Sequence, residues 1–502
     1  MTIYNINLGI GWASSGVEYA QAYRAKILRN LDISSKFVFL DLFQFENIQH
    51  LTANLGYKDD EIIWLYQYFT DIKIAPTTYR IKDILNKIDK QISKIETTGN
   101  IKRIFFENNQ DFITCYLHDT SKEIVNRAEF VSKGNLIRKD FYSYTKVFSE
   151  YYAPFENKAK LYMRQFYNEN GSIAFSEYID NGTQLYIFND KKFYNKESFI
   201  AYFIQQLRLT SKDIIILDRS THIGQAVLQN KGESKIGVVV HAEHFNESSS
   251  DNDKVLWNNY YDYQFTQARE IDFFITATDI QRYILKQQMR HFKGLKPVIK
   301  TIPVGSLSKL KYPTRKRKSY SIITASRLAS EKHIDWLLYA VIKAKKYLPH
   351  LTFDIYGEGV EKGKLQKIID QQKANGYIQL KGHVNLDEVY TRYELFVTGS
   401  TSEGFGLTLM EAVGSGLAMI GFDVNYGNPT FIENEENGYL IPFSADNINL
   451  EEITDNISKK IIEYFNGDKE SMHEKSYEIA KKFRTDKIEF KWQNLIEEVL
   501  ND

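Results

Sequence analysis

The sequence lacks the features that mark secreted, membrane-spanning and nucleic-acid-binding proteins. Its single cysteine, Cys115, has no partner for an internal disulfide, so a reducing compartment, the cytoplasm by default, is expected. The 64 basic and 64 acidic residues leave no net charge, which argues against nucleic-acid binding by bulk electrostatics. No apolar run approaches the roughly 18 residues that span a bilayer, and the basic segment of a signal peptide is missing.

Only 8 prolines occur, and charged residues (25%) and hydrophobic residues (43%) have ordinary globular proportions. Extensive disorder is therefore not expected. A chain of 502 residues is long enough for about two to four domains with sizeable cores.

The first 40 residues predict a β-loop-α-β unit. Residues 3–8 and 36–40 have strand patterns, and a glycine-rich turn precedes a helix over residues 17–28. The turn is neither a P-loop, because Lys and Ser or Thr do not follow Gly16, nor a dinucleotide fingerprint, because its last glycine comes too late. A close approach of backbone to phosphate at Gly16 stays plausible.

Between residues 50 and 210 the pattern changes. Isoleucines and a leucine at helical spacing predict an amphipathic helix over residues 81–95. Short β-prone runs separated by Asn and Gly turns follow, and they indicate an antiparallel meander inserted into an α/β protein. The runs are residues 102–106, 112–117, 128–131, 161–167, 172–178 and 184–188.

From residue 213 buried-strand runs alternate with helical stretches, which is typical of doubly wound parallel sheets. The basic segment 309–318 separates two such series and is interpreted as a solvated linker. The sequence thus predicts two Rossmann-like domains, with the last helix packing back on the first. The predicted ranges are 1–50 with 210–310 for the first Rossmann-like domain, 51–209 for the inserted extension, 315–485 for the second Rossmann-like domain and 486–502 for the last helix.

One strand-loop-helix segment carries the strongest functional signal. Glu403 precedes a Gly-Phe-Gly loop, and Glu411 lies eight residues further on in the helix. Backbone N–H groups at a helix start can point to a ligand at the carboxyl ends of the strands, and two carboxylates can accept hydrogen bonds from sugar hydroxyls. Either glutamate alone would be interpreted as an ordinary acidic residue of a helix start. The N–H groups concerned are those of Phe405, Gly406 and Leu407.

A second strand-to-helix junction carries two cations, Arg327 and Lys332. Two positive side chains and the helix dipole together favour a diphosphate. Taken alone they would be solvated surface charges. If they face the Glu403 loop from the same end of the sheet, they can hold a leaving group.

His241 follows a buried run in the first domain, where ligands of α/β proteins gather, so it is a candidate donor at the site. Asp251 and Asp253 form a weak DxD match, for which a polar loop is the favoured interpretation. A single cysteine excludes a zinc site of the Cys-cluster type. Since Arg327 and Lys332 can balance a diphosphate, no metal is expected.

These segments resemble retaining glycosyltransferases of the two-Rossmann GT-B fold, family-4 type. The resemblance implies that Arg327 and Lys332 bind the donor diphosphate, that Glu403 with the following N–H groups holds the donor sugar, and that Glu411 binds the ribose. His241 would contact the sugar near the reacting carbon. Further implied contacts are Gly16 and Val17 with the β-phosphate and His383 and Val384 with the base; His333 stands where many members have glycine.

The inserted meander narrows the resemblance to bacterial enzymes that glycosylate serine-rich repeat adhesins or wall teichoic acid. The whole chain is most similar to the N-acetylglucosamine transferase subunits of the adhesin system. This implies UDP-N-acetylglucosamine as donor, Ser and Thr hydroxyls of an unfolded acceptor, a homologous non-catalytic partner bound through the extension, and peripheral contact with the inner face of the membrane. The alternatives are a teichoic acid or polysaccharide transferase and a non-catalytic acceptor-binding subunit.

Overall fold

The computed structural model describes residues 1–11, 16–107, 110–446 and 448–501. The chain divides into two compact units, one of residues 1–25 and 33–237 and one of residues 26–32 and 238–502. The predicted α/β class, with parallel sheets and an antiparallel extension, is confirmed. The predicted domain boundaries stay a prediction. Among the described residues, no helix has both the length and the apolar character needed to cross a bilayer.

The first unit contains parallel strands in the order β14-β1-β2-β3. The central strands are buried because side chains cover both faces of the sheet, as in α/β proteins generally. These strands are β1 (Ile3–Asn7), β2 (Ser35–Phe39), β3 (Ile62–Trp64) and β14 (Ile214–Leu217). The helices are α1 (Gly16–Asn30, whose last residues belong to the second unit), α2 (Ile48–Asn54), α3 (Leu65–Tyr68), α4 (Ile81–Leu85), α5 (Lys196–Gln206) and α6 (Gly224–Asn230).

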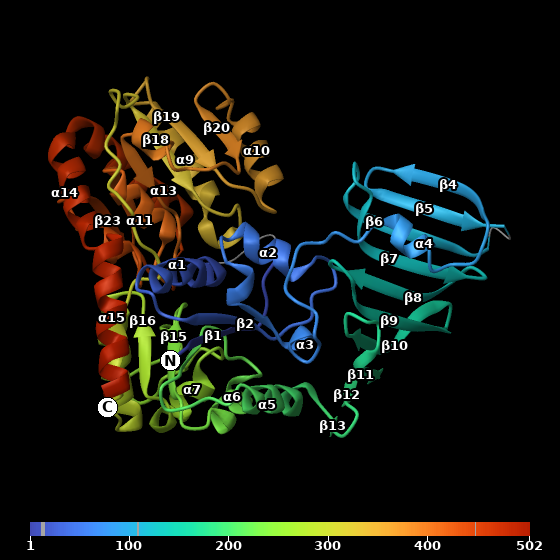
Figure 1. Cartoon of the computed structure of the whole chain (residues 1–502). Coiled ribbons are helices and arrows are strands. Elements are labelled where there is room, and N and C mark those ends of the chain that lie inside the picture. The colour runs from blue at the N-terminus through green and yellow to red at the C-terminus, as the bar shows by residue number, and fades with distance from the viewer. Residues whose placement is uncertain (12–15, 108–109, 447, 502) are drawn as a thin grey trace. The chain divides into compact units, whose positions relative to one another are not determined.

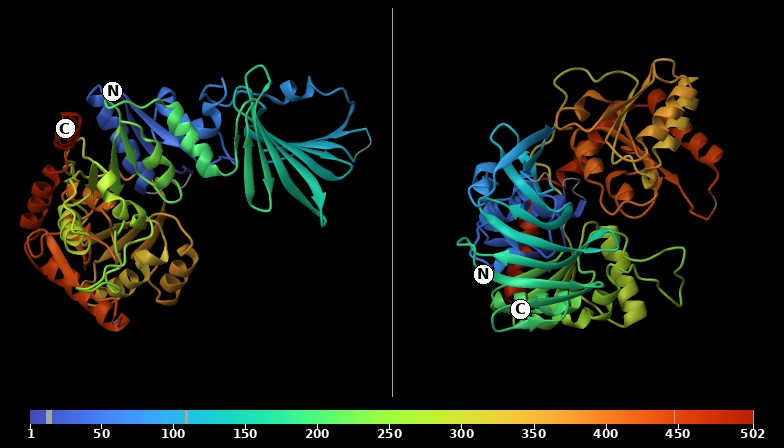
Figure 2. Two further views of the ribbon diagram at one scale, coloured as in Figure 1. Left: turned by 90° about the horizontal axis from the view of Figure 1, so that it is seen from below. Right: turned by 90° about the vertical axis from the view of Figure 1, so that its right-hand side faces the viewer.

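The extension is one antiparallel sheet of ten strands that follow each other in chain order (Figures 1 and 2). Short turns join consecutive strands, so each strand pairs with its neighbour in sequence. The strands are β4 (Ile92–Thr98), β5 (Ile101–Phe106), β6 (Phe112–Asp119), β7 (Ile124–Ser132), β8 (Asn135–Tyr142), β9 (Lys146–Phe155), β10 (Lys158–Tyr167), β11 (Ile173–Asp180), β12 (Thr183–Ile187) and β13 (Lys192–Phe193).

The predicted helix over residues 81–95 is wrong beyond its first turn. The helix α4 ends at Leu85, and Ile92 and Ile95 lie on the edge strand β4 with 43% and 52% of their surface exposed. Isoleucine is β-branched and favours strands, and residues three apart lie on opposite faces of a strand. The helical spacing in this segment therefore does not correspond to one buried face.

A buried ion network joins strands β9, β10 and β11. Arg164 Nε donates to Glu150 Oε1 at 2.8 Å, and Arg164 Nη1 donates to Glu177 Oε2 at 2.9 Å. Glu150 also accepts from Tyr152 Oη at 2.6 Å and from Gln44 Nε2 at 2.5 Å. Since Gln44 lies outside the extension, this network ties the extension to the parallel strands of the same unit.

The second unit begins within β15 (Lys235–Val240) and contains a six-stranded parallel sheet in the order β20-β19-β18-β21-β22-β23. The strands are β16 (Phe273–Thr276), β17 (Ile299–Thr301), β18 (Ser321–Ala325), β19 (Thr352–Tyr356), β20 (Ile378–Gly382), β21 (Leu395–Val397), β22 (Ala418–Asp423) and β23 (Gly438–Pro442). The helices are α7 (Asp262–Thr266), α8 (Asp279–Lys293), α9 (Ile334–Lys345), α10 (Lys362–Gln371), α11 (Leu407–Gly414), α12 (Asn428–Phe431), α13 (Leu450–Asn466), α14 (Lys469–Lys481) and α15 (Thr485–Asn501).

The last helix, α15, contacts the start of this unit. Lys491 Nζ donates to the Thr301 carbonyl at 3.2 Å, and Asn30 Nδ2 donates to Glu489 Oε1 at 2.7 Å. Thr301 ends β17 and Asn30 ends α1, both within the ranges predicted for the first domain.

The basic segment 309–318 is not wholly a solvated linker, because Arg317 is bound within the second unit. Its guanidinium donates to the carbonyls of Tyr393 at 2.8 Å and Ser415 at 2.7 Å, and more weakly to those of Thr391 and Gly416. Burial lowers the pKa of Arg317. The segment therefore carries at least one structural cation.

We expect Arg164→Leu to destabilise the extension by about 3–5 kcal/mol, because removing the cation leaves two buried carboxylates without their partner. Native-state hydrogen exchange of peptides from β9 to β11 measures this change. The control is Lys160→Leu, which removes an exposed pair with Asp180 at 3.5 Å and should cost less than about 1 kcal/mol. Equal protection in the two variants would show that the buried network does not hold the sheet.

Candidate functional site

The loop between β21 and α11 is fixed by backbone contacts on both sides of Glu403. The Glu403 carbonyl accepts from the N–H groups of Tyr426 and Gly427, both at 2.8 Å, and the Glu403 N–H donates to the Asn425 carbonyl at 3.2 Å. Gly406, at the N-cap of α11, has a φ of 88°, a conformation that glycine adopts without steric cost. The loop thus holds the Glu403 side chain at the carboxyl end of the sheet.

Lys332 and Glu403 form a direct ion pair. Lys332 Nζ donates to Glu403 Oε2 at 2.7 Å, and their side chains are only 17% and 23% exposed. Lys332 ends the short 3-10 turn Ser330–Lys332 between β18 and α9. The structure therefore brings the predicted cation and the predicted carboxylate together from two strand-to-helix junctions of one sheet.

Gly399 allows these two junctions to pack closely. A Cβ atom at position 399 would lie 2.8 Å from the His333 carbonyl oxygen and 2.9 Å from that of Lys332. His333 itself has a φ of 44°, and its ring stacks on Trp336 with 3.7 Å between centroids. Glycine adopts this left-handed backbone conformation more easily than histidine does. Position 333 is the one at which many members of the family have glycine.

Arg327 is placed differently from Lys332. Its Nη2 donates to Glu331 Oε1 at 3.2 Å, and the side chains are 72% and 54% exposed. Its backbone turn is held tightly, since Cβ atoms at Gly357 and Gly359 would lie 1.8 Å and 2.3 Å from the carbonyl oxygens of Ser326 and Leu328. Arg327 therefore has a fixed backbone and an exposed guanidinium.

The two glycines that hold the Arg327 turn were not predicted to be functional. They follow β19 in the sequence Tyr356-Gly-Glu-Gly359. Two glycines directly after a buried strand are the signal that could have identified a close backbone approach at this sheet edge.

His241 lies beside the Glu403 loop. A Cβ atom at Gly404 would be 2.5 Å from the His241 carbonyl oxygen and 3.7 Å from the Ala242 Cα. His241 directly follows β15, as expected. The structure thus brings together the backbones of His241 and the loop that carries Glu403.

A buried histidine, His244, fixes the loop after β22. Its Nε2 pairs with Gln288 Oε1 and its Nδ1 with Tyr426 Oη, both at 2.8 Å. Because an amide oxygen only accepts, Nε2 carries the proton and Nδ1 accepts from the tyrosine hydroxyl. Burial lowers the pKa of His244 to about 4. His244 was not predicted from the sequence, although it holds Tyr426 and with it the backbone partner of Glu403.

The remaining predicted contacts of the second unit occupy several environments. Glu411 Oε2 accepts from Tyr390 Oη at 3.1 Å, and burial raises the pKa of Glu411.

Phe405 is 4% exposed and packs against Phe431 and Phe483, so its side chain belongs to the core and only its backbone can face a ligand. Leu407 packs against the same core. His383 and Val384 follow β20 and are exposed.

Gly16 and Val17 start α1 in the first unit. Residues 12–15 of the predicted glycine-rich turn lie outside the described residues. Further along α1, Arg24 donates to both carboxylate oxygens of Asp218 at 2.7 and 2.8 Å, and Gln21 Nε2 donates to Asp218 Oδ2 at 2.7 Å. This buried network fixes the helix against β14.

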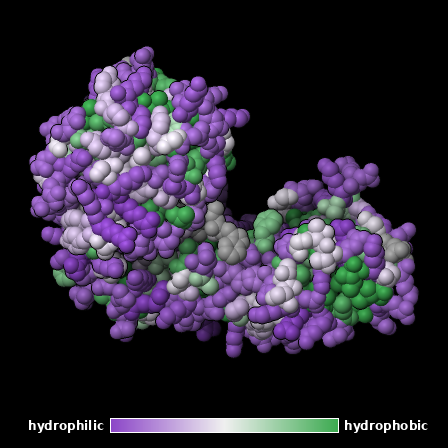
Figure 3. All heavy atoms as spheres, turned by 90° about the horizontal axis from the view of Figure 1, so that it is seen from above, coloured by the Kyte–Doolittle hydropathy of each residue, from purple (hydrophilic) through white to green (hydrophobic). Residues whose placement is uncertain are grey.

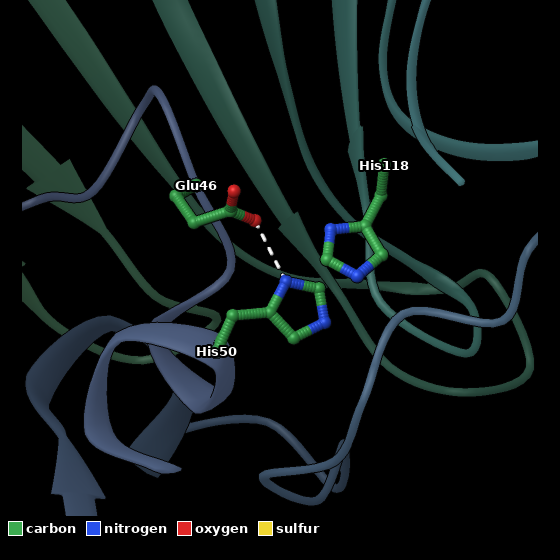
Figure 4. A group of neighbouring side chains, drawn as sticks. All are labelled: Glu46, His50 and His118. Carbon is green, nitrogen blue, oxygen red and sulfur yellow. Dashed lines mark hydrogen bonds and ion pairs between the residues drawn. The ribbon is translucent and has the colours of Figure 1, made fainter. Parts of the chain in front are cut away.

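One group with metal-ligand chemistry occurs among the described residues, Glu46, His50 and His118 (Figure 4). The Thr77 N–H donates to His50 Nε2 at 3.2 Å, so His50 Nδ1 carries the proton that Glu46 Oε1 accepts at 2.8 Å. A metal on Nδ1 would replace this proton while Nε2 still faces a donor. The arrangement therefore fits a hydrogen-bonded junction between α2 and β6, where the His50 and His118 rings stack.

Asp251 Oδ1 accepts from the N–H groups of Asp253 and Lys254 at 2.9 and 3.0 Å. The carboxylate thus caps its own exposed turn, in agreement with the polar-loop interpretation of the DxD match.

Comparisons with known proteins cover the whole chain. Residues 94–190 match the family model of the GtfA extended beta-sheet domain, and residues 309–482 match that of glycosyl transferases group 1. The GtfA subunit of the UDP-N-acetylglucosamine–peptide N-acetylglucosaminyltransferase of Streptococcus gordonii is 53% identical, over 100% of this chain and 99% of the relative.

Solved structures agree with these matches. The pneumococcal O-GlcNAc transferase GtfA in complex with UDP and GlcNAc is 53% identical and superposes with a TM-score of 0.95 over 100% of this chain and 99% of its own. A chain of the GtfA/B complex is 52% identical, with a TM-score of 0.96 and full coverage of both chains. The expected GT-B fold with its inserted extension is confirmed.

We expect Gly404→Ala to destabilise the Glu403 loop by about 1–3 kcal/mol, because the new methyl group overlaps the His241 carbonyl. Hydrogen exchange of a peptide covering residues 400–410 measures this. Gly363→Ala is the control, since a Cβ atom there meets nothing within 4 Å. If the loop exchanged at the same rate in both variants, the close approach would not limit its stability.

We expect His244 to make the second unit less stable at low pH. Its folded pKa of about 4 lies below the ordinary value of 6.5, so its stabilising contribution is complete above pH 6.5 and is lost as the pH falls toward 4, by about 3 kcal/mol. Native-state hydrogen exchange of β16 between pH 7 and pH 4 should show a shallower loss in His244→Asn. The exposed His350→Asn control should keep the wild-type slope; a wild-type slope in His244→Asn would contradict the assignment.

Proposed function

Because this chain belongs to the GtfA family of UDP-N-acetylglucosamine–peptide N-acetylglucosaminyltransferase subunits, we propose that it transfers N-acetylglucosamine from UDP-N-acetylglucosamine to Ser and Thr hydroxyls. The proposed acceptor is an unfolded serine-rich repeat adhesin. The family membership rests on identity over the full length of the chain, including the extension.

The observation that carries this proposal at the level of chemistry is the ion pair between Lys332 and Glu403. Two junctions at one sheet edge supply a cation for the departing diphosphate and a carboxylate for the sugar hydroxyls. The pneumococcal relative, which is similar over the same length, has been solved with UDP and GlcNAc. This supports placing the donor beside Lys332 and Glu403.

In the proposed reaction the anomeric configuration is retained, and the attacking hydroxyl approaches the face that the UDP leaves. Negative charge grows on the diphosphate as its bond to the sugar breaks, so the positive charges of Lys332 and Arg327 stabilise the transition state. Glu403 orients Lys332 in the free enzyme and accepts from the sugar hydroxyls in the complex. His241 contacts the sugar near the reacting carbon.

The remaining residues would bind the nucleotide. Glu411 would accept from the ribose hydroxyls, and the raised pKa that burial gives it would fall when a ligand donates hydrogen bonds to it. The backbones of Gly16 and Val17 would approach the β-phosphate, and His383 and Val384 would contact the base. We propose no metal, because the two cations can balance the diphosphate charge.

The partner in this proposal is a homologous non-catalytic subunit that binds through the extension. The solved GtfA/B complex contains a chain 52% identical to this one. Hydrophobic side chains gather on the surface of the extension (Figure 3), and several large ones are exposed on its strands: Ile92, Ile95, Ile137, Phe155, Tyr162, Ile173 and Tyr178. An exposed apolar sheet surface suits a protein partner. The cytoplasm, with peripheral contact at the inner face of the membrane, is the proposed location.

The experiment that tests this function incubates the full-length chain, with and without the partner subunit, with a panel of nucleotide sugars and a serine-rich peptide. We expect a mass shift of one N-acetylhexosamine from UDP-N-acetylglucosamine. Transfer to poly(ribitol phosphate) and to no peptide would favour a teichoic acid transferase instead. Acceptor binding without turnover of any donor would favour a non-catalytic subunit.

We expect Glu403→Gln and Lys332→Ala to lower the turnover of peptide glycosylation by about 10²–10³-fold, because each removes a charge that acts on the transition state. Donor affinity should change less than turnover, and steady-state kinetics with UDP-N-acetylglucosamine separate the two. Glu463→Gln, which alters a pair with Lys460 on the surface of α13, is the control. Near-normal rates in both site variants would remove the assignment.

A further inference from the structure

A cleft of about 1080 Å³ adjoins the Glu403 loop within the second unit. One wall is formed by Glu243 and residues 245–248 and 256–260, and the other by residues 401–402, 423–425 and 443–446. Ser402 precedes Glu403, and Glu243 follows His241 by two residues. The cleft therefore continues from the backbone elements that carry the proposed catalytic groups.

Specific contacts hold the two walls against each other. His244 and Tyr426 form a buried hydrogen bond of 2.8 Å, the Gly404 backbone touches the His241 carbonyl, and Asn425 Nδ2 donates to Glu247 Oε2 at 3.5 Å. The first wall is itself braced, since the Asn246 N–H donates to the Leu256 carbonyl at 2.8 Å. The cleft is thus a formed feature of the unit.

The charge of this cleft has one sign. The described residues that line it include four carboxylates, those of Glu243, Glu247, Asp423 and Asp446, and none of these described lining residues is a lysine, arginine or histidine. Burial and the charge of Glu247 raise the pKa of Glu243, which also bonds to Ser402. Like charges in a cleft produce a field that repels anions and attracts neutral or cationic ligands.

This charge disfavours the donor nucleotide as the occupant, since a diphosphate would face carboxylates with no opposite charge among the lining residues that the structure describes. The cations assigned to the diphosphate, Arg327 and Lys332, do not line the cleft. Its remaining lining suits an extended polypeptide. Amide side chains of Asn246, Asn258 and Asn259 can pair with peptide groups, and Trp257 and Tyr260 offer apolar faces.

We infer that this cleft binds the segment of the acceptor polypeptide next to the reacting hydroxyl and selects uncharged or basic segments over anionic ones. The inference rests on the proposed function and names the acceptor chemistry of the same site. A serine-rich chain without acidic residues enters a cleft with negative potential at no electrostatic cost. A polymer with a phosphate in every repeat is repelled there, as is a peptide rich in Asp and Glu.

The test compares two unfolded peptides, one with Ser and neutral residues and one in which Glu replaces alternate neutral residues, with the full chain and its partner subunit. We expect kcat/KM for the acidic peptide to be at least about tenfold lower than for the neutral one. The preference should weaken at 1 M salt, where the Debye length falls to about 3 Å. The ratio of the two values cancels any effect on donor turnover.

Asp423→Lys combined with Asp446→Lys should raise kcat/KM for the acidic peptide, relative to kcat/KM for the neutral peptide, by about tenfold or more. Both side chains are exposed, so the fold should tolerate the change. The control, Glu474→Lys with Glu478→Lys on α14, alters the net charge equally outside the cleft and should leave the ratio unchanged. An unchanged ratio in the cleft variant, with transfer to the neutral peptide intact, would overturn the cleft assignment alone. Transfer to poly(ribitol phosphate) and to neither peptide would overturn the protein acceptor and the cleft assignment together.

Discussion

The site depends on the close packing of backbone around Glu403. Glycines at positions 399, 404 and 427 allow three neighbouring segments to approach within distances that a Cβ atom would forbid. The approach places Lys332 within 2.7 Å of Glu403. A partly buried ion pair requires fixed geometry to offset the loss of solvation. The ion pair between Lys332 and Glu403 therefore depends on the close backbone packing that these glycines allow.

The same packing gives the site two electrostatic regions. Lys332 and Glu403 pair with each other in the free protein. In the proposed complex, the donor diphosphate can pair with Lys332 instead, and the sugar hydroxyls can donate to Glu403. The adjoining cleft has four carboxylates and no cation among its described lining residues. An anionic donor and an uncharged acceptor are therefore favoured at different places along one stretch of backbone.

The sequence predicted those parts of the fold that depend on local pattern. The buried runs that became β14 and β15 were predicted because they are continuous and apolar. The strands β8 and β9 were missed because charged residues interrupt their apolar pattern. The helix predicted over residues 81–95 failed because a spacing of three or four also occurs by chance in a strand rich in isoleucine.

Within the site, residue types were predictable and their partners were not. Lys332 and Glu403 were identified from their positions at helix starts, but Gly404 contacts His241 across 163 positions of the chain (404 − 241), and no local pattern shows such a contact. Arg317 illustrates the same limit. It lies in a run of basic residues that is typical of a solvated segment, yet carbonyls about 75 to 100 residues further on bind it.

The role of His244 follows from this dependence on distant contacts. A neutral, buried imidazole that accepts from Tyr426 and donates to Gln288 fixes the backbone that holds Glu403. A lysine or a carboxylate at this position would carry a charge into a buried site without an opposite partner, which is costly. A neutral imidazole joins a tyrosine hydroxyl to an amide oxygen at no net charge, so the support of the loop adds nothing to the electrostatics of the neighbouring acidic cleft.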